Sequence, residues 1–271
     1  MIVVKIGGAR AVDPGAAIDD VAALTGEGED VVVVHGGSTA VDDALDAMGK
    51  EPEYVETPGG VTGRFTDAET MDVFTMAMGK VNVDLVVDLQ NAGVSAVGLA
   101  GVDGALLTGP RKSAVKVRED GKTKIRRGDH SGKIEAVNGD LLETLLDAGH
   151  VPVVSVPMLA DDGVAVNTDA DRAAAAVAAE LSASLVVLTD VAGVYEDVDD
   201  PGTRIDLVDS PAALDAAADA AEGFMTRKVL AAKEALDGGA TAVVIADAGS
   251  DEPIRSALDG EGTRFTPDAR A

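Results

Sequence analysis

The feature that constrains this chain most is a regular alternation of short, valine-rich apolar runs with longer segments of helical periodicity. Unbroken apolar runs are typical of strands that are buried on both faces of a parallel sheet. The alternation therefore predicts an α/β fold with three layers (αβα) around a mainly parallel central sheet. The predicted strands are Ile2–Ile6, Val31–His35, Val94–Leu99, Val151–Ser155, Leu185–Thr189 and Ala242–Ala246, and the predicted helices lie near Ala16–Leu24, Thr39–Met48, Asp67–Asn91, Gly139–Ala148, Asp169–Leu181 and Met225–Leu236.

One segment interrupts the alternation. Between Ser113 and Arg127 the pattern is strand, turn and strand, with the turn at residues 119–121, which predicts a β-hairpin inserted between α/β units. The same region is basic, because residues 111–133 contain nine Lys and Arg against three Asp and Glu. The whole chain has a formal net charge of -26, so this basic island calls for an explanation of its own.

Composition excludes several classes of protein. A hydrophobic content of 46% excludes disorder in spite of the net charge of -26, and that charge leaves no basic surface for nucleic acid. Cysteine is absent, which excludes disulfides, a thiolate nucleophile and Cys-ligated zinc. No apolar run is long enough to span a bilayer and no secretory signal is recognised, so we expect a cytoplasmic protein without a membrane partner. The scattered acidic residues indicate a surface adapted to concentrated salt, where self-repulsion is screened within about 3 Å.

Two glycine-rich turns follow the first two predicted strands, at Lys5-Ile6-Gly7-Gly8 and at His35-Gly36-Gly37-Ser38. Ligands of open α/β sheets collect at the carboxyl ends of the strands, so Lys5 is placed where a phosphate is expected. Glycines let backbone N–H groups approach an anion, and the helix that follows Ser38 would direct its N-terminus at the same charge. We expect Ser38 to cap that helix and His35 to have a structural role.

Polar residues at three later turns complete a possible site. Arg64 is predicted to lie in a loop before a helix capped by Thr66 or Asp67, free to pair with a carboxylate. Before the alanine-rich helix, Asp169 is the expected cap, while Asn167 can bind a substrate carboxylate and Asp171 can hold lysine ammonium groups. Lys228 supplies a second candidate phosphate lysine. The chain has no P-loop, since the string at residues 128–134 is one residue short and lacks the required Ser or Thr.

In this order and spacing, the motifs resemble those of the amino-acid kinase superfamily over nearly the whole chain, and most closely its acetylglutamate kinase branch. They are Lys5-x-Gly7-Gly8, His35-Gly36-Gly37, Gly63-Arg64, Val166-Asn167-x-Asp169-x-Asp171, Thr189-Asp190-Val191-x-Gly193-Val194 and Met225-x-x-Lys228. The resemblance implies transfer of the γ-phosphoryl group of ATP to a side-chain carboxylate. Such a nucleophile needs no general base, so the lack of a catalytic His or Cys is no obstacle.

The resemblance also implies a role for each matching residue. Lys5 and Lys228 stabilise charge on the transferring phosphoryl group, and Asp171 organises the two lysines. Backbone donors come from Gly8, Gly36 and Gly37, while Arg64 and Asn167 hold the amino-acid end of the acceptor. ATP, carrying Mg²⁺ with no metal site of the protein's own, would be bound by Gly7, Gly8, Thr189, Asp190, Gly193, Tyr195 and Met225. An N-terminal lobe (1–158) would bind the acceptor and a C-terminal lobe (159–271) would bind ATP.

Some strings depart from plain acetylglutamate kinases. Ser38 replaces a third glycine, and residues 63–70, 98–104 and 129–135 look more like a subgroup whose acceptor is glutamate or 2-aminoadipate carried on an acidic amino-group carrier protein. In that subgroup the basic hairpin acquires a purpose, because it can dock the carrier. The candidate docking residues are Lys116, Arg118, Lys124, Arg126 and Arg127. The alternative is that these cations neutralise acidic residues of the same protein.

Three alternatives of function stay open at this stage. The first is an ordinary N-acetylglutamate kinase with a free small acceptor, and the second is a non-catalytic nucleotide-binding regulator. A nucleobase-monophosphate kinase is a more remote alternative, since Arg64 and Asn167 fit a carboxylated acceptor better. The sequence does not choose between glutamate and aminoadipate, and the homodimer that is common in this branch is an expectation from the resemblance alone.

Overall fold

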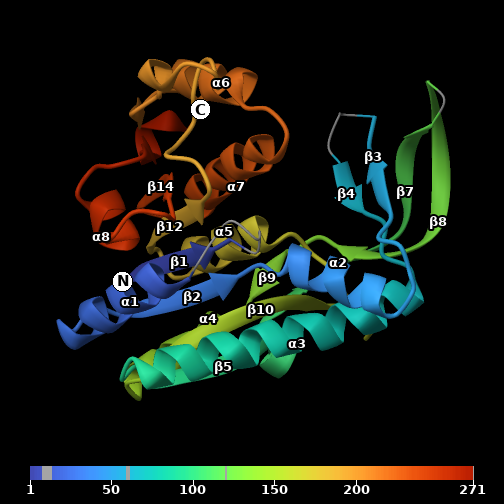
Figure 1. Cartoon of the computed structure of the whole chain (residues 1–271), viewed down its shortest axis with the longest axis horizontal. Coiled ribbons are helices and arrows are strands. Elements are labelled where there is room, and N and C mark those ends of the chain that lie inside the picture. Colours follow the sequence, from blue (N-terminus) through green and yellow to red (C-terminus); the bar gives the residue numbers. More distant parts are fainter. Residues whose placement is uncertain (8–13, 59–61, 120, 271) are drawn as a thin grey trace.

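The structure is a computed structural model that describes residues 1–7, 14–58, 62–119 and 121–270. Helices and strands alternate along most of the chain, as the sequence predicts (Figure 1). The helices are α1 (Gly15–Gly26), α2 (Ser38–Ala47), α3 (Ala68–Asn91), α4 (Gly139–Asp147), α5 (Ala170–Glu180), α6 (Pro211–Ala220), α7 (Phe224–Gly238) and α8 (Pro253–Leu258).

The strands include all six that the sequence predicts, with the third displaced by two residues. They are β1 (Ile2–Ile6), β2 (Val31–His35), β3 (Tyr54–Glu56), β4 (Thr62–Arg64), β5 (Ala96–Gly101), β6 (Leu107–Gly109), β7 (Arg111–Glu119), β8 (Lys122–Gly132), β9 (Ala136–Val137), β10 (Val151–Ala160), β11 (Ala165–Val166), β12 (Ser184–Thr189), β13 (Leu207–Val208), β14 (Ala242–Asp247) and β15 (Thr263–Phe265).

Within the described residues, the main sheet has eleven strands in the order β13-β15-β14-β12-β1-β2-β10-β6-β9, with β5 and β11 also paired to β10. The central pairs are parallel, from β14 through β12, β1 and β2 to β10 and β5. The antiparallel pairs involve β9, β11 and β15. The predicted mainly parallel sheet is therefore confirmed.

Both faces of the sheet are buried, which explains why its strands have unbroken apolar sequences. Along β2, Val32 and Val34 belong to a core shared with α2, α4, α5, α6 and α7, and Val31 and Val33 to a core shared with α1 and α8. Successive side chains point to opposite faces, so one run of valines contributes to two cores. The helix α3 is long enough to contribute to both.

Two hairpins stand apart from the main sheet. The strands β7 and β8 form the inserted hairpin that the sequence predicts, and they extend beyond the predicted ends to Arg111 and Gly132. A second hairpin, β3–β4, lies beside it, and the two project together from the body (Figure 1). The sequence did not predict β3–β4, since three-residue strands carry too little periodicity.

Candidate active site

A buried carboxylate bridges two buried lysines at the centre of the molecule. Lys5 Nζ of β1 lies 2.7 Å from Asp171 Oδ1, and Lys228 Nζ of α7 lies 3.1 Å from Asp171 Oδ2. The three residues are 5–9% exposed. Asp171 reaches this position because Asp169, as predicted, caps α5 by accepting from the N–H groups of residues 171 and 172. The structure thus brings together three residues separated by up to 223 positions in sequence.

The three charges change one another's protonation. Burial by itself raises the pKa of Asp171, but the charges of Lys5 and Lys228 outweigh it and bring that pKa down to about 2. The pKa of Lys228 is lowered, mainly by burial and then by the charge of Lys5, while Asp171 acts in the opposite direction. The cluster carries two cations and one anion, so a net positive charge is held at the carboxyl end of β1.

The first glycine turn is described only in part. Gly7 follows β1 directly, whereas Gly8 lies outside the described residues. The second turn departs from expectation at Gly36, whose N–H donates to the Ile6 carbonyl oxygen at 3.1 Å. This N–H continues the β1–β2 ladder, so the prediction that it serves as a donor to the ligand is wrong. His35 has the structural role that we expected, being 1% exposed and hydrogen-bonded to the Gly36 carbonyl oxygen and to Asn82.

Gly37, and not Ser38, is the N-terminal cap residue of α2, and no side chain caps the helix. The prediction that Ser38 is the cap is therefore wrong, because the helix begins one residue earlier than the pattern indicates. The Ser38 hydroxyl instead accepts from Arg64 Nη2 at 3.1 Å. A Cβ at position 37 would lie 2.5 Å from Met78 Sδ, so glycine allows α3 to pack closely against this turn.

Arg64 lies in the short strand β4 and not in a free loop, which corrects the prediction. Its Nη2 donates to Asp42 Oδ1 at 2.7 Å, to the Ser38 carbonyl oxygen at 2.9 Å and to the Tyr54 hydroxyl at 3.0 Å. The side chain is 6% exposed, and within the described residues its Nε has no hydrogen-bond partner. An unpaired donor on a buried guanidinium is costly unless a further acceptor binds it.

Asn167 connects the segment before α5 to Thr66 and to the strand β8. Its Nδ2 donates to Thr66 Oγ1 at 3.0 Å, and its backbone is hydrogen-bonded to His130 and Gly132 of β8. The base of the basic hairpin is therefore tied directly to the segment that leads into α5. The Thr66 contact could not be predicted from local sequence patterns, because 101 positions separate the two residues.

The predicted nucleotide residues follow β12 and begin α7. Thr189 ends β12 and is buried, and its hydroxyl donates to Asp190 Oδ1 at 3.1 Å. Gly193 has a φ of +150°, and a Cβ there would lie 2.5 Å from Thr263 Oγ1, so the close approach of β15 requires glycine. Tyr195 bridges to Arg204, and Met225 lies three residues before Lys228 on α7. Thr189, Asp190 and Gly193 thus lie at or just beyond the carboxyl end of one strand, which is next to β1.

The basic hairpin divides its cations between its two faces. Opposite residues of an antiparallel pair share a face, so Lys116 with Ile125, Ala114 with Arg127, and Arg118 with Thr123 lie on one face. Lys124 and Arg126 lie on the other face with the buried Val117.

Several of the hairpin cations have acidic partners in the same chain. Arg126 forms a two-pronged ion pair with Glu53 and lies over the Phe65 ring at 4.2 Å. Lys124 pairs with Glu119 at 2.7 Å, and Arg118 lies 3.9 Å from Glu56. In the described part of the chain, neither Lys116 nor Arg127 forms an ion pair. Self-neutralisation therefore accounts for some of the island's cations but not for all.

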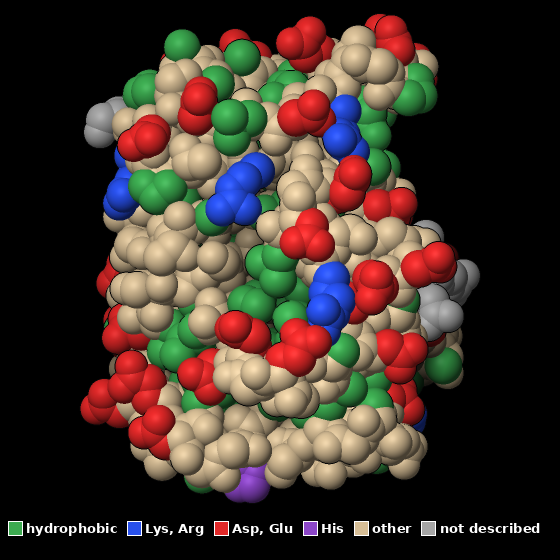
Figure 2. Space-filling view, turned by 90° about the vertical axis from the view of Figure 1, so that its left-hand side faces the viewer, with side chains coloured by type: hydrophobic (Ala, Val, Ile, Leu, Met, Phe, Trp, Pro, Cys, Tyr) green, Lys and Arg blue, Asp and Glu red, His purple; other side chains and the backbone are tan. Residues whose placement is uncertain are grey.

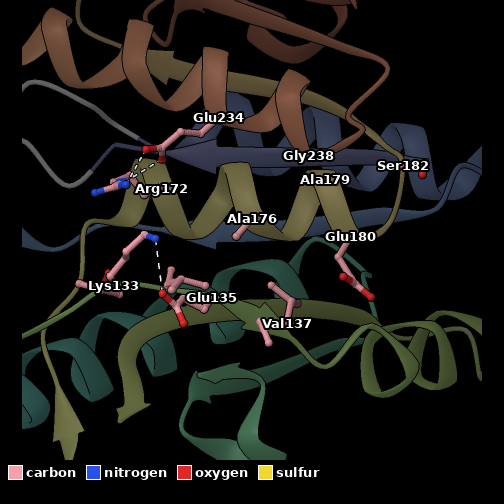
Figure 3. Close-up of a pocket in the computed structure, with 13 residues that line it drawn as sticks. Lys133, Glu135, Val137, Arg172, Ala176, Ala179, Glu180, Ser182, Glu234 and Gly238 are labelled. Carbon is pink, nitrogen blue, oxygen red and sulfur yellow. Dashed lines mark hydrogen bonds and ion pairs between the residues drawn. The ribbon is translucent and has the colours of Figure 1, made fainter. Parts of the chain in front are cut away.

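A groove of about 700 Å³ runs along α5 (Figure 3). Its floor is Ala176 and Ala179, and its walls carry the ion pairs Arg172–Glu234 and Lys133–Glu135. None of the predicted site residues lines this groove among the residues described. Its two cations, Lys133 and Arg172, are already paired with Glu135 and Glu234, so the groove does not provide the positive charge that a phosphate needs.

The fold and the lysine cluster together define a phosphotransferase of the α/β class. The model of the amino acid kinase family matches residues 1–247. The chain therefore belongs to the amino acid kinase family.

Relatives and solved structures agree with this family. The chain is 43% identical over 270 residues to the LysW-aminoadipate kinase of Thermus thermophilus, covering 97% of this chain and 99% of the relative. It is 39% identical over 267 residues to the acetylglutamate kinase of Methanopyrus kandleri, covering 97% and 99%. An N-acetylglutamate synthase structure from Neisseria gonorrhoeae, in complex with coenzyme A and N-acetyl-glutamate, has a TM-score of 0.76 at 25% identity. The match covers 98% of this chain and 59% of that one.

Proposed function

We propose that this protein transfers the γ-phosphoryl group of ATP to the side-chain carboxylate of 2-aminoadipate or glutamate linked to an amino-group carrier protein. The observation that carries the proposal is the Lys5–Asp171–Lys228 cluster at the carboxyl end of β1. The likeness to a LysW-aminoadipate kinase supports the carried acceptor. The product would be an acyl phosphate for lysine or arginine biosynthesis.

The reaction needs positioning and charge stabilisation from the protein. A carboxylate oxygen of the acceptor attacks the γ-phosphorus, and the bond from that phosphorus to the bridging oxygen of ADP breaks, with no proton transferred. Lys5 and Lys228 reach toward the equatorial oxygens from opposite sides of Asp171, which keeps both ammonium groups oriented before the substrates bind. Mg²⁺ carried by ATP would neutralise charge on its β- and γ-phosphates.

The acceptor and the nucleotide would bind on opposite sides of this cluster. We assign acceptor binding to residues 1–158, where the buried Nε of Arg64 is, among the described residues, a free hydrogen-bond donor for its carboxylate. Asn167 of the second lobe, whose amide is hydrogen-bonded to Thr66 of the first lobe, would add a second group for the acceptor. We assign ATP to residues 159–271, where Thr189, Asp190 and Gly193 lie at or just beyond the carboxyl end of a strand next to β1. Gly7, Gly8 and Gly37 would supply backbone donors between the two.

The carrier would dock on the exposed face of the basic hairpin. Lys116 and Arg127 lie there without internal ion pairs in the part of the chain that the structure describes, and Arg118 is only loosely held by Glu56. Ile125, paired with Lys116, is 67% exposed and provides an apolar contact among the cations. Acidic partners suit such a face, and fitted pairs around a central apolar residue still act when salt screens long-range attraction.

Reversing the charge of this face separates the carrier-dependent function from the small-molecule alternative. With Lys116→Glu and Arg127→Glu together, the KM for a carried acceptor should rise about tenfold or more, while the KM for ATP is unchanged. Lys233→Glu on the exposed surface of α7 is the matched control. An ordinary N-acetylglutamate kinase would keep its acceptor KM in both variants, and the acetylglutamate kinase relative makes this the second candidate function.

The direct test of the function compares acceptors by release of ADP from Mg-ATP in molar KCl. The panel is free glutamate, N-acetylglutamate, and glutamate or aminoadipate on the C-terminus of a carrier protein. Turnover of a carried acceptor above the others supports the proposal and identifies the preferred residue. Equal or better turnover of N-acetylglutamate would refute carrier dependence, and no turnover with any acceptor would favour a nucleotide-binding regulator.

The surface supports two further proposals about the protein's setting. Acidic side chains are spread over the face that Figure 2 shows, as expected for a protein that works in the concentrated salt of a cytoplasm. On α3, the apolar residues Met76, Val83 and Val87 are 50–59% exposed at helical spacing, so we propose that a homodimer forms through this helix. In the described parts of the chain, no helix is long and apolar enough to cross a membrane.

A further inference from the structure

A chain of buried hydrogen bonds links α3, β10 and the second glycine turn. Asn82, on the inner side of α3, donates from Nδ2 to the Val153 carbonyl oxygen at 2.9 Å, and the same nitrogen lies 3.1 Å from His35 Nε2. On the other side of the ring, His35 Nδ1 lies 3.0 Å from the Gly36 carbonyl oxygen. Asn82 is 8% exposed and His35 is 1% exposed, so water does not compete for these bonds.

The Val153 carbonyl oxygen determines which atoms donate and which accept in this whole series of hydrogen bonds. A carbonyl oxygen only accepts, so the Asn82 atom that faces it must be the amide nitrogen. The second hydrogen of that nitrogen then points at His35 Nε2, which must be the unprotonated acceptor. The proton of the neutral ring is therefore on Nδ1, which donates to the Gly36 carbonyl oxygen.

The bond to Gly36 also fixes the direction of the next N–H group. The peptide unit between Gly36 and Gly37 is planar and trans, so the Gly36 carbonyl and the Gly37 N–H point in opposite directions. With the carbonyl held by His35, the Gly37 N–H is directed away from the ring. No backbone hydrogen bond occupies this N–H within the described residues. It is left available for a ligand at the N-terminus of α2.

We propose that Asn82 and His35 are positioning residues for phosphoryl transfer, which aim the Gly37 N–H at an anionic oxygen of the substrates. This inference rests on the proposed function, because it assumes that such an oxygen is bound at the turn. Gly98 of β5 supports the arrangement from the far side of Asn82. A Cβ at position 98 would lie 2.2 Å from Asn82 Oδ1, so glycine leaves the room that this amide needs.

The surroundings of His35 keep the ring neutral. Its pKa is lowered mainly by burial and also by the charge of Lys5 from β1, against the opposing effect of the bond to Gly36. Lys5 is itself paired with Asp171 from α5. From α3 the polar group that faces the ring is Asn82, and from β10 the strand neighbour is the uncharged Ser155. Asn82 thus determines which nitrogen carries the proton, while burial determines that only one of them does.

The protonation state can be measured without any activity assay. The chain contains three histidines, so ¹⁵N NMR can resolve the imidazole nitrogens of His35 in the full-length protein. We expect a ring that is neutral at neutral pH, with hydrogen on Nδ1 and with a pKa below that of an ordinary histidine. A ring with hydrogen on Nε2, or one that titrates near neutral pH, would overturn the inference.

Asn82→Asp tests the link to catalysis, since it keeps the size of the side chain but replaces the donor by an acceptor. The carboxylate of the variant requires a proton on His35 Nε2. A neutral ring then has no proton on Nδ1 and loses its hydrogen bond to Gly36, whereas the imidazolium donates to both the carboxylate and Gly36. The kcat of the variant relative to wild type should therefore fall, by roughly tenfold or more, as the pH rises from about 6 to about 9. Leu85→Ala, a cavity one turn away on α3, is the control, and its ratio to wild type should not depend on pH.

A second pair of variants keeps the test decisive if Asn82→Asp does not fold. His35→Asn retains a nitrogen donor near the position of Nδ1, whereas His35→Leu removes it, so the asparagine variant should keep a kcat about tenfold higher. Equal values for the two variants, or an Asn82→Asp ratio that is flat with pH, would overturn the positioning role. Failure of wild type to phosphorylate any acceptor would refute the proposed function instead, while the NMR result stands by itself.

Discussion

Replacing Asp171 by asparagine removes the carboxylate that the two buried lysines share, while keeping the size of the side chain. In the wild type its two oxygens lie 2.7 Å from Lys5 Nζ and 3.1 Å from Lys228 Nζ. The variant leaves two ammonium groups in the same buried space with no anion between them. Both stability and catalysis should therefore suffer, for separate reasons.

The magnitude follows from the two distances. With an effective dielectric constant of about 20, each pair attracts by about 5–6 kcal/mol, part of which offsets the cost of burying the charges. Removal of one partner from such a buried group typically costs about 3–5 kcal/mol of folding free energy. A domain with about 5–15 kcal/mol of stability can still fold after this loss. Because the lysines also lose their fixed orientation, we expect kcat to fall about 10²- to 10³-fold.

The pH dependence of kcat provides an independent test of the same argument. The pKa of Lys228 is already lowered by burial and by Lys5, and Asp171 opposes this effect. Without the carboxylate, the pKa of Lys228 falls further. The charged form of this lysine is then lost at a lower pH, so the kcat of Asp171→Asn should decline on the alkaline side earlier than that of wild type.

The assays are urea unfolding in molar KCl and steady-state kinetics with Mg-ATP. Asp169→Asn is the matched control, because asparagine also caps a helix well and the variant loses only the partly exposed pair with Arg227 and the smallest of the charge effects on Lys228. The control should cost about 1 kcal/mol or less. A kcat of Asp171→Asn within threefold of the control, with the same alkaline limb as wild type, would refute the argument that Asp171 organises the lysines.

Three more predictions concern the same site. The pKa of Asp171 is about 2 in the folded protein against an ordinary 3.8. About 2 kcal/mol of folding stability should therefore be present above pH 4 and lost as the pH falls toward 2, and unfolding of Asp171→Asn should lack this acid-dependent loss. Arg64→Lys should raise the KM for the acyl acceptor about tenfold and leave the KM for ATP unchanged, since one ammonium cannot replace the bonds of Nη2 and also keep a second donor for the ligand. An unchanged KM for the acceptor would contradict the role of Arg64. Gly37→Ala should lower kcat because its Cβ meets Met78 Sδ, and Met78→Ala should restore part of it in a double-mutant cycle; additive losses would show that the contact is not the cause.

The strands were predictable because parallel strands buried on both faces leave an unbroken valine signal, as in residues 31–34. The predicted lysine cluster also lies together, because Lys5 is at the carboxyl end of β1 and α5, which carries Asp171, packs against both β1 and α7. The roles of its residues in catalysis stay predictions. Short elements such as β3 and β4 were missed, because three residues do not define a period.

Contacts between distant segments were not predictable from local patterns. Asp20 of α1 accepts from the N–H groups of residues 254 and 255, and so holds the N-terminus of α8 across more than 230 positions. Asn82 likewise meets His35 only because α3 lies across the end of β2. Gly36 was assigned a free N–H because a glycine motif does not reveal that the strand ladder continues through it.

The most direct test of the central claim is a hydroxylamine trap for acyl phosphate, with Mg-ATP, molar KCl and a carrier protein that bears C-terminal aminoadipate or glutamate. The account predicts ATP-dependent formation of a hydroxamate on the carrier, lost in Lys5→Met and weakened by the charge reversal of Lys116 and Arg127. Hydroxamate formed as well from free N-acetylglutamate would contradict carrier dependence. ATP consumption without any trapped acyl phosphate would contradict the claim that a carboxylate is the acceptor.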